Sequence, residues 1–236
     1  MPDWLTSILL GIIEGITEFL PVSSTGHLLV PQQLGWLETQ SDVFNIAIQS
    51  GAVVAVLFNF TDRVKQLTLR WREPEARDYL AKLLVAFVIT GVGGLLIDKL
   101  GFKLPEDVLP VAVALLVGGV LFVVVEKKIG GRANLAEVTW AIAIAVGFGQ
   151  LLAAMFPGTS RSGATILIAL LMGLRRMPAI EFTFLLGVPT LLAAGASKVF
   201  KAIRDESVTA DWGQLAPATD RKTGVSGKRR GRGGRR

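Results

Sequence analysis

Residues 4–30 read WLTSILLGIIEGITEFLPVSSTGHLLV, an apolar run that a polar, proline-bearing turn divides in two. The first part, 4–20, approaches the roughly 20 residues that a helix needs to cross a ~30 Å hydrocarbon core. The second part, 24–37, is too short to cross. Irregular backbone at membrane depth is tolerated where protein or water surrounds it. The stretch therefore predicts a helical hairpin that dips into the membrane and returns.

A second stretch repeats this pattern further along the chain. The apolar run 138–156 is followed by a turn that contains Pro157 and by a short apolar run at 162–174. We expect a second helical hairpin there. At an offset of 136 residues Glu14 aligns with Gln150, Pro21 with Pro157, Ser23 with Thr159 and Ser24 with Ser160, and at an offset of 138 Phe44 aligns with Phe182.

The segments between the hairpins decide how the two units are related. Three full apolar spans separate them, at 43–60, 80–97 and 108–125, and a further apolar run follows at 180–200. An odd number of crossings means that the second unit enters from the opposite side of the membrane. The sequence therefore predicts an inverted-topology repeat, whose site lies near the midplane between the two broken elements.

The composition is that of a membrane protein. Of 236 residues, 51% are hydrophobic and 19% are charged, and the mean hydropathy is +0.52. A soluble domain of this length would carry more charge to cover its surface. The predicted fold is an all-α, polytopic transmembrane bundle with two re-entrant hairpins. The absence of cysteine and the single histidine exclude disulfide scaffolds and sites built from several cysteines or histidines, so a metal would be a hard, oxygen-bound cation.

The net charge of +6 is unevenly distributed. Residues 217–236 hold 8 of the 25 Lys and Arg and 1 of the 19 Asp and Glu, a net +7, so residues 1–216 carry −1. We expect a membrane-embedded domain over 1–216 and a basic, disordered tail over 217–236. The tail has no interleaved aromatic residue, so nucleic-acid binding is not expected. Lys and Arg gather in the loops 61–82 and 127–137, which predicts that both are cytoplasmic and that the first hairpin opens to the outside.

Glu14 and Glu18 lie four residues apart in the first apolar run, and on a helix this spacing puts both carboxylates on one face. Two anions in that position repel each other and lose solvation, so they need a cation, a shared proton or a basic partner. The pair predicts a functional site. The alternative is a water-facing stripe on an interfacial helix.

The first turn also gathers hydroxyl groups and the one imidazole. Ser24 and His27 are three residues apart, close enough in a first helical turn for the ring to exchange a proton with the hydroxyl. The alternative interpretation is structural, because serine and threonine are good N-caps and a lone histidine is often a packing residue.

The second turn, 156–165, has the composition of an anion site. Arg161 is the only charged residue between Glu137 and Arg175. Glycine lets the backbone approach a ligand, a following helix aims its first N–H groups at the turn, and the guanidinium fork matches phosphate oxygens. The alternative pairs Arg161 with Glu14 or Glu18 and needs no ligand. Together the two turns predict hydrolysis of a phosphate ester or anhydride whose apolar part stays in the bilayer.

The two turns resemble two signatures of one family. Residues 14–28, EGITEFLPVSSTGHL, look like the first signature of the undecaprenyl-diphosphatase family of the bacitracin-resistance type, and residues 157–165, PGTSRSGAT, look like its second. The resemblance runs from about residue 4 to 216. It implies a bacterial inner-membrane enzyme, its site open to the periplasmic side, that converts undecaprenyl diphosphate to undecaprenyl phosphate and inorganic phosphate. Such an enzyme recycles the lipid carrier for peptidoglycan synthesis and confers bacitracin resistance, and a divalent cation, Mg²⁺ or Ca²⁺, supports its activity.

Carried over by position, the resemblance implies a role for each of these residues. Glu14 and Glu18 would serve metal binding and acid–base chemistry, and Ser24 would be the nucleophile. His27 would activate Ser24 or protonate the leaving oxygen, and Arg161 would hold the diphosphate. Direct attack by a metal-activated water, with Ser24 only binding, stays an alternative. The substrate-binding set would be Ser23, Thr25, Gln49, Gly158, Thr159, Ser160 and Ser162.

The end of the chain departs from the family pattern. Members of the family continue after the equivalent of residue 216 with two more transmembrane helices, whereas here Pro217 begins the basic tail. We therefore expect a C-terminally shortened bundle that keeps the site residues. The alternatives to the enzyme are an anionic-lipid transporter or flippase, which an inverted repeat also suits, and an inactive truncated family member. The oligomeric state is left open, a homodimer included.

Overall fold

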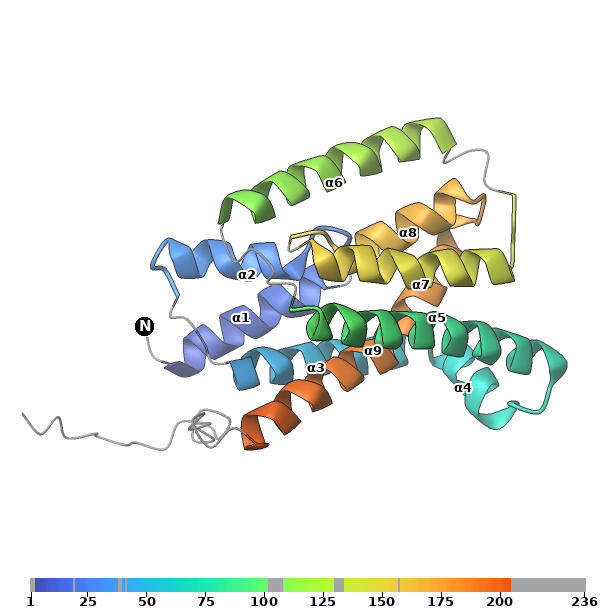
Figure 1. Ribbon diagram of the computed structural model, residues 1–236, viewed down its shortest axis with the longest axis horizontal. Coiled ribbons are helices and arrows are strands. Elements are labelled where there is room, and N and C mark those ends of the chain that lie inside the picture. Colours follow the sequence, from blue (N-terminus) through green and yellow to red (C-terminus); the bar gives the residue numbers. More distant parts are fainter. Residues whose placement is uncertain are drawn as a thin grey trace, which may run out of the picture.

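The structure, a computed structural model, describes residues 3–18, 20–37, 40, 42–101, 108–129, 134–156 and 158–204. In these ranges the chain forms nine helices, which confirms the all-α prediction (Figure 1). They are α1 (Asp3–Thr17), α2 (Ser24–Gln33), α3 (Asp42–Asn59), α4 (Thr61–Leu69), α5 (Pro74–Lys99), α6 (Val108–Ile129), α7 (Trp140–Met155), α8 (Arg161–Leu171) and α9 (Arg176–Arg204).

Three helices in the described ranges are long and apolar enough to cross a membrane, and they lie in α5, α6 and α9. Four shorter apolar helices accompany them, in α1, α3, α7 and α8. The side chains on the outside of α5 and α6 are apolar and exposed, such as Leu95 and Leu116. Exposed apolar side chains of this density suit contact with lipid rather than water. The chain is therefore a multi-pass membrane protein.

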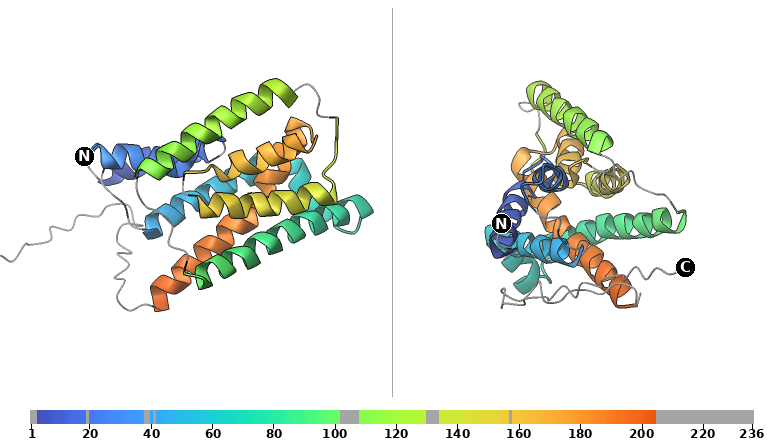
Figure 2. Two further views of the ribbon diagram at one scale, coloured as in Figure 1. Left: turned by 45° about the horizontal axis from the view of Figure 1, so that its top comes forward. Right: turned by 90° about the vertical axis from the view of Figure 1, so that its left-hand side faces the viewer.

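The short helices pair in the order that the sequence predicts. The chain reverses direction between α1 and α2 and again between α7 and α8, and in each pair the second helix packs on the first (Figure 1). The helices α3 and α9, which follow these pairs, pack against each other. The helix α6 lies at one edge of the bundle in both views of Figure 2. The two turns thus face the interior from different helical pairs.

Small residues allow the closest helix–helix contact, between α5 and α7. A Cβ added at Gly147 would lie only 3.0 Å from the carbonyl oxygen of Ala86, so no larger residue fits there without a shift. The Thr90 hydroxyl on α5 lies 2.9 Å from the Ala86 carbonyl oxygen of its own helix and 3.3 Å from the Gly147 carbonyl oxygen, so both acceptors share its proton. Lipid tails are as apolar as leucine, so close packing and such hydrogen bonds, more than the hydrophobic effect, hold membrane helices together.

Each helical pair has a buried phenylalanine behind it. Phe44 of α3 is 6% exposed and packs with Leu10 and Leu28 from the first pair. Phe182 of α9 is 1% exposed and packs in a cluster that contains Ile142 from the second pair. Each of these side chains thus joins the helix that follows a pair to the pair itself.

The segment 61–82, which the sequence analysis treats as a loop, is helical. Its first part is α4, because Val64 and Leu67 lie three residues apart and pack on one side against Leu185 of α9. Its second part is the start of α5, which begins at Pro74 instead of residue 80. Proline fits the first turn of a helix, where its missing N–H costs nothing. The predicted tail at 217–236, like Pro157, lies outside the described residues.

Candidate active site

The acidic pair sits where the first helix ends. The Glu18 N–H donates to the Glu14 carbonyl at 2.9 Å, which continues the helical pattern one residue past α1 and puts the two side chains one turn apart. Glu14 is fully buried, and neither of its carboxylate oxygens has a hydrogen-bond partner among the described residues. Its carboxylate lies within electrostatic reach of Glu18, Ser24 and Arg161. A buried carboxylate without a partner is costly, so the position favours a bound cation or proton.

Ser24 is the first residue of α2 and faces back toward this pair. Its Oγ donates a hydrogen bond to Oε2 of Glu18 at 2.6 Å. Ser23, just before it, has a φ of 64°, the left-handed region that side chains rarely adopt. This backbone conformation reverses the chain within the turn and brings the Ser24 hydroxyl to Glu18.

His27 makes a different contact from the one that its spacing suggests. Its ring is exposed, and Nδ1 lies 2.9 Å from the carbonyl oxygen of Ser23. Because a carbonyl only accepts, Nδ1 carries the proton, and in the neutral ring Nε2 keeps its lone pair. The Ser24 hydroxyl donates to Glu18 and not to His27.

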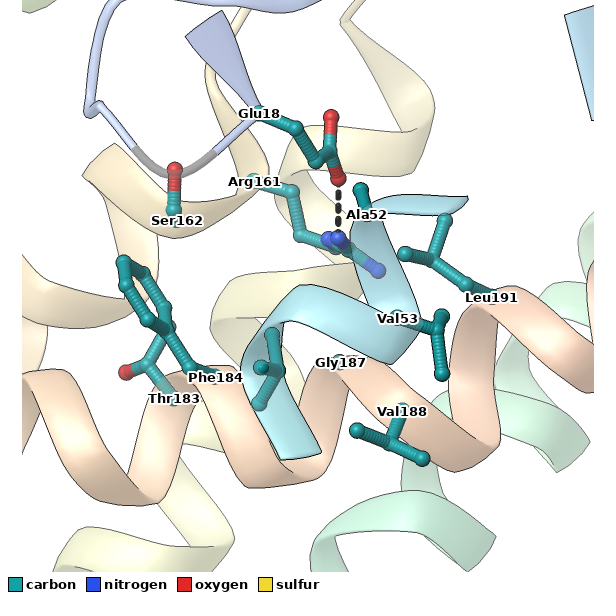
Figure 3. A pocket seen from close by; sticks show the side chains of 11 residues that line it. Glu18, Ala52, Val53, Arg161, Ser162, Thr183, Phe184, Gly187, Val188 and Leu191 are labelled. Atoms are coloured by element: carbon teal, nitrogen blue, oxygen red, sulfur yellow. Dashed lines mark hydrogen bonds and ion pairs between the residues drawn. The ribbon is translucent and has the colours of Figure 1, made fainter. Parts of the chain in front are cut away.

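The second turn delivers Arg161 to the same place. Ser160 caps α8 by accepting the Gly163 N–H at 3.1 Å, so Arg161 is the first residue of that helix. Its Nη2 forms an ion pair with Oε1 of Glu18, which Figure 3 shows as a dashed line. Its Nη1 donates to Oγ1 of Thr190 on α9 at 3.3 Å. Glu18 therefore holds Ser24 with one oxygen and Arg161 with the other.

The two turns also touch directly. The Ser162 hydroxyl lies 3.4 Å from the Leu20 carbonyl oxygen, and it is 3.1 Å from the Ser160 hydroxyl. A Cβ added at Gly163 would lie 3.3 Å from the carbonyl oxygen of Pro21. The hairpin turns are thus packed against each other, and they bring hydroxyls, carboxylates and a guanidinium together.

A narrow pocket with a cavity volume of about 20 Å³ lies beside the ion pair (Figure 3). Its polar lining comes from Glu18, Arg161, Ser162 and Thr183, and the rest of its wall is apolar. The side chains of α3 and α9 that complete the wall are Ala52, Val53, Val56, Phe184, Val188 and Leu191, together with Gly187. A pocket that is charged at one end and apolar on its flanks suits a ligand with a charged head and an apolar chain.

Comparisons with known proteins identify the family of this chain. The profile of the family described as "Bacitracin resistance protein BacA" matches residues 7–219. An undecaprenyl-diphosphatase of Rhizobium etli (strain CIAT 652) is 50% identical over 218 residues, which are 92% of this chain and 82% of that protein. One of Xanthomonas oryzae pv. oryzae (strain PXO99A) is 46% identical over 220 residues, again 92% and 82% of the two chains. The chain belongs to the BacA family.

Some residues that the sequence analysis assigns to substrate lie away from the pocket of this BacA chain. Gly158 is buried with a φ of 89°, and a Cβ there would come within 2.6 Å of the Val111 carbonyl oxygen on α6. What approaches its backbone is therefore a neighbouring helix. Thr159 lies in the turn before α8, and Gln49 is partly exposed on α3; neither lines the pocket. Thr25 belongs to α2, and its side chain lies outside the described part of the structure.

The helix α9 contributes to the site of this BacA chain in a way that was not predicted from the sequence. Thr183 and Gly187 line the pocket, and Thr190 accepts a hydrogen bond from Arg161. A signal was available, since Gly187 and Pro189 interrupt an otherwise apolar helical run just before Thr190. Glycine, proline and threonine together mark both hairpin turns as well.

The carboxylates fit the cation that the resemblance implies. In the described ranges no group of three or more acidic, histidine or cysteine residues could hold a metal ion. Mg²⁺ does not require such a group, because it is commonly bound through one or two carboxylates, water and substrate phosphates. Glu14, whose two buried oxygens have no hydrogen-bond partner among the described residues, would be available as a ligand, and Glu18 lies one turn away.

Proposed function

We propose that this chain is an undecaprenyl-diphosphatase, which hydrolyses the phosphoanhydride of undecaprenyl diphosphate to undecaprenyl phosphate and inorganic phosphate. The observation that carries the proposal is the division of the Glu18 carboxylate between Ser24 and Arg161. The carboxylate of Glu18 and the guanidinium of Arg161 line one pocket with an apolar wall, and the Ser24 hydroxyl is bonded to Glu18 beside it. This is the set of groups that phosphoryl transfer from a lipid diphosphate requires.

Arg161 would bind the diphosphate. A guanidinium has five N–H donors, of which Glu18 and Thr190 each take one. The remaining N–H groups can donate to phosphate oxygens in the forked geometry that arginine favours. The N-terminus of α8, which begins at Arg161, adds the positive end of a helix dipole at the same point.

Ser24 would attack the terminal phosphorus. Its proton already faces Oε2 of Glu18 at 2.6 Å, so Glu18 can take that proton as the Oγ–phosphorus bond forms. The bond from phosphorus to the bridging oxygen then breaks, and undecaprenyl phosphate leaves. Water hydrolyses the phosphoserine and releases inorganic phosphate. Direct attack by water, with Ser24 as a binding group, gives the same products. Replacing Ser24 by alanine distinguishes this route from attack by the serine hydroxyl.

His27 would transfer the proton that the leaving oxygen of undecaprenyl phosphate needs. With Nδ1 bonded to the Ser23 carbonyl, the lone pair of Nε2 can accept a proton at the exposed side of the turn and pass it on. Glu14 and Glu18 would hold the divalent cation, which neutralises charge on the phosphoryl oxygens when it is bound.

We further propose that the pairs α1–α2 and α7–α8 are re-entrant hairpins related by an inverted-topology repeat. The positions that the repeat equates have similar surroundings. Glu14 and Gln150 are both buried, and neither side chain has a hydrogen-bond partner among the described residues. Phe44 and Phe182 are both buried behind their own pair. Such matched environments support equivalent places in two halves of opposite orientation.

The same proposal assigns the chain to the bacterial inner membrane with its site open to the periplasmic side. Arg63, Lys65, Arg70 and Arg72 lie in or beside α4; Arg175 lies between α8 and α9, and Arg176 begins α9. Arginine and lysine are enriched on the cytoplasmic side of membrane proteins. An accessibility assay with a membrane-impermeant thiol reagent, on single cysteines placed at Arg72 and at His27, tests this orientation.

The experiment that tests the activity measures inorganic phosphate released from undecaprenyl diphosphate by the purified, detergent-solubilised chain, with and without a chelator. The proposal expects release that the chelator suppresses and added Mg²⁺ restores. A transporter or flippase of anionic lipids would release no phosphate in detergent, since transport breaks no bond.

A further inference from the structure

Arg161 is held from a third side, by α9, in addition to the two hairpin turns. Thr190 Oγ1 accepts a hydrogen bond from Arg161 Nη1 at 3.3 Å. Gly187 lies one turn earlier on the same helix, and a Cβ added there would be 3.5 Å from Nη2 and 3.8 Å from Cζ of Arg161. The guanidinium therefore rests against the backbone of α9 at Gly187, with Thr190 beside it.

The hydrogen bonds of Thr190 have a fixed direction. A hydroxyl has one proton, and that of Thr190 is directed to main-chain carbonyls of its own helix, at 2.8 Å from Leu186 and 3.0 Å from Gly187. Its lone pairs are then left for a donor, and Arg161 is that donor.

Glu18 and Thr190 fix opposite arms of the guanidinium. Nη2 is paired with Glu18 and Nη1 is bonded to Thr190, so rotation about the side-chain axis would break one of the two contacts. An arginine that is already oriented loses less conformational entropy when it binds a forked anion.

We propose that Gly187 and Thr190 form a shelf on α9 that orients Arg161 for the diphosphate, with Thr190 as a positioning residue. This inference rests on the proposed function, because it assigns to Arg161 the binding of phosphate oxygens. The shelf residues touch Arg161 and not the reacting phosphorus. Their loss should therefore weaken binding of the diphosphate more than it slows the chemical step.

The first test compares Thr190→Val with Thr190→Ser in the phosphate-release assay. Valine keeps the branched shape and removes the hydroxyl, whereas serine keeps the hydroxyl. We expect Thr190→Val to raise KM for undecaprenyl diphosphate about tenfold, the scale of one hydrogen bond to a charged group, with kcat changed less than about twofold. Thr190→Ser should keep both within about twofold. An unchanged KM in Thr190→Val overturns the proposal, whether or not kcat falls. A lower kcat at unchanged KM is what a misfolded fraction of the protein would give.

A second pair of variants keeps the proposal testable where Thr190→Val fails to fold. Alanine at Gly187 puts its Cβ at ordinary contact distance from the guanidinium, and valine extends further into the space that it occupies. We expect Gly187→Ala to keep KM within about twofold and Gly187→Val to raise KM about tenfold or more. Equal KM values in the two variants overturn the shelf.

Phosphate release by the unmodified chain distinguishes a failure of the shelf from a failure of the proposed function. Absence of phosphate release from the unmodified chain counts against the proposed function. Normal release together with shelf variants that match the unmodified chain in KM counts against the shelf alone.

Discussion

Glu18 and Arg161 are 143 residues apart in the sequence, and their side chains form an ion pair that joins the end of α1 to the start of α8. The side chains are 15% and 27% exposed, so the pair is largely removed from solvent but still open to the pocket. The other oxygen of Glu18 accepts the Ser24 hydroxyl. One carboxylate thus connects the group that would attack phosphorus with the group that would hold the phosphate.

Replacing Arg161 by alanine should lower turnover of undecaprenyl diphosphate by at least ~10²-fold, because a charge-stabilising donor in the site is lost. The same change removes the partner of Glu18 and leaves that carboxylate with Ser24 alone. Arg175→Ala is the matched control, since Arg175 is an exposed arginine in the segment that follows α8. Phosphate release measured for both variants checks the prediction, and near-normal turnover in Arg161→Ala would remove this residue from the site.

Replacing Glu14 by glutamine should also lower turnover by at least ~10²-fold. Glutamine keeps the shape of the buried side chain and removes the charge that would hold a cation. The exposed Glu137→Gln serves as the control for the loss of one acidic group. Turnover is measured over a series of Mg²⁺ concentrations. A Glu14→Gln variant with the Mg²⁺ dependence and rate of the unmodified chain would refute a role for Glu14 in cation binding.

Replacing Ser24 by alanine separates the two chemical routes. If Ser24 is the nucleophile, turnover falls to the background of the assay, because no Oγ–phosphorus bond can form. Substantial residual phosphate release would instead favour direct attack by water. Thr68→Ala is the control, because Thr68 is an exposed hydroxyl on α4 that bonds only to carbonyls of its own helix.

The cluster around Glu181 should contribute to the free energy of unfolding and not to turnover of the substrate. Arg63 on α4 donates Nε to Glu181 on α9 at 2.7 Å, and the Tyr79 hydroxyl on α5 donates to the same oxygen at 3.3 Å. The Arg63 guanidinium also lies 4.9 Å from the centre of the Tyr79 ring. Glu181→Gln weakens the two hydrogen bonds to this side chain, so we expect a free energy of unfolding lower by about 1 kcal/mol.

The matched control for Glu181 is Glu126, whose ion pair with Arg176 is far more exposed. Glu126→Gln should change the free energy of unfolding by less than about 0.5 kcal/mol, since exposed pairs contribute little. Intrinsic-fluorescence melts of the two variants in one detergent compare them. Equal melting temperatures would show that the Glu181 cluster does not stabilise the bundle.

The two helical pairs could be predicted from the sequence because the patterns that indicate them are local. A proline-bearing turn between a long and a short apolar run predicts α1–α2 and α7–α8, and a spacing of four residues puts Glu14 and Glu18 on one face. Opposite charges in apolar runs rarely stay unpaired, which is why an Arg161–glutamate pair was among the expectations. All of these arguments use residues within one turn or one helix of each other, or a general cost of burying charge.

The contributions that the sequence did not predict depend on contacts between distant segments. Thr190 reaches Arg161 only because α8 packs on α9; Gly187 and Pro189 mark an interruption of the helix near Thr190 but do not indicate which segment lies against it. Gly158 looks like a residue that lets backbone approach a ligand, but the approaching group is the backbone of α6. The helix α4 forms in a basic segment because Val64 and Leu67 find apolar partners on other helices. Tertiary packing overrides the local pattern at each of these places.

Ser23 offers a test of whether the first turn acts through its backbone or its side chain. Its φ of 64° is the only positive φ of a non-glycine residue in the described part of the chain, and its carbonyl accepts both the N–H and Nδ1 of His27, at 3.3 and 2.9 Å. Glycine adopts this conformation without steric cost, and alanine does not. If the backbone is what matters, Ser23→Gly and Ser23→Ala both keep turnover within about threefold, and the glycine variant melts at the higher temperature. A KM raised tenfold or more in both variants would instead show that the Ser23 hydroxyl binds the substrate, as the resemblance implies.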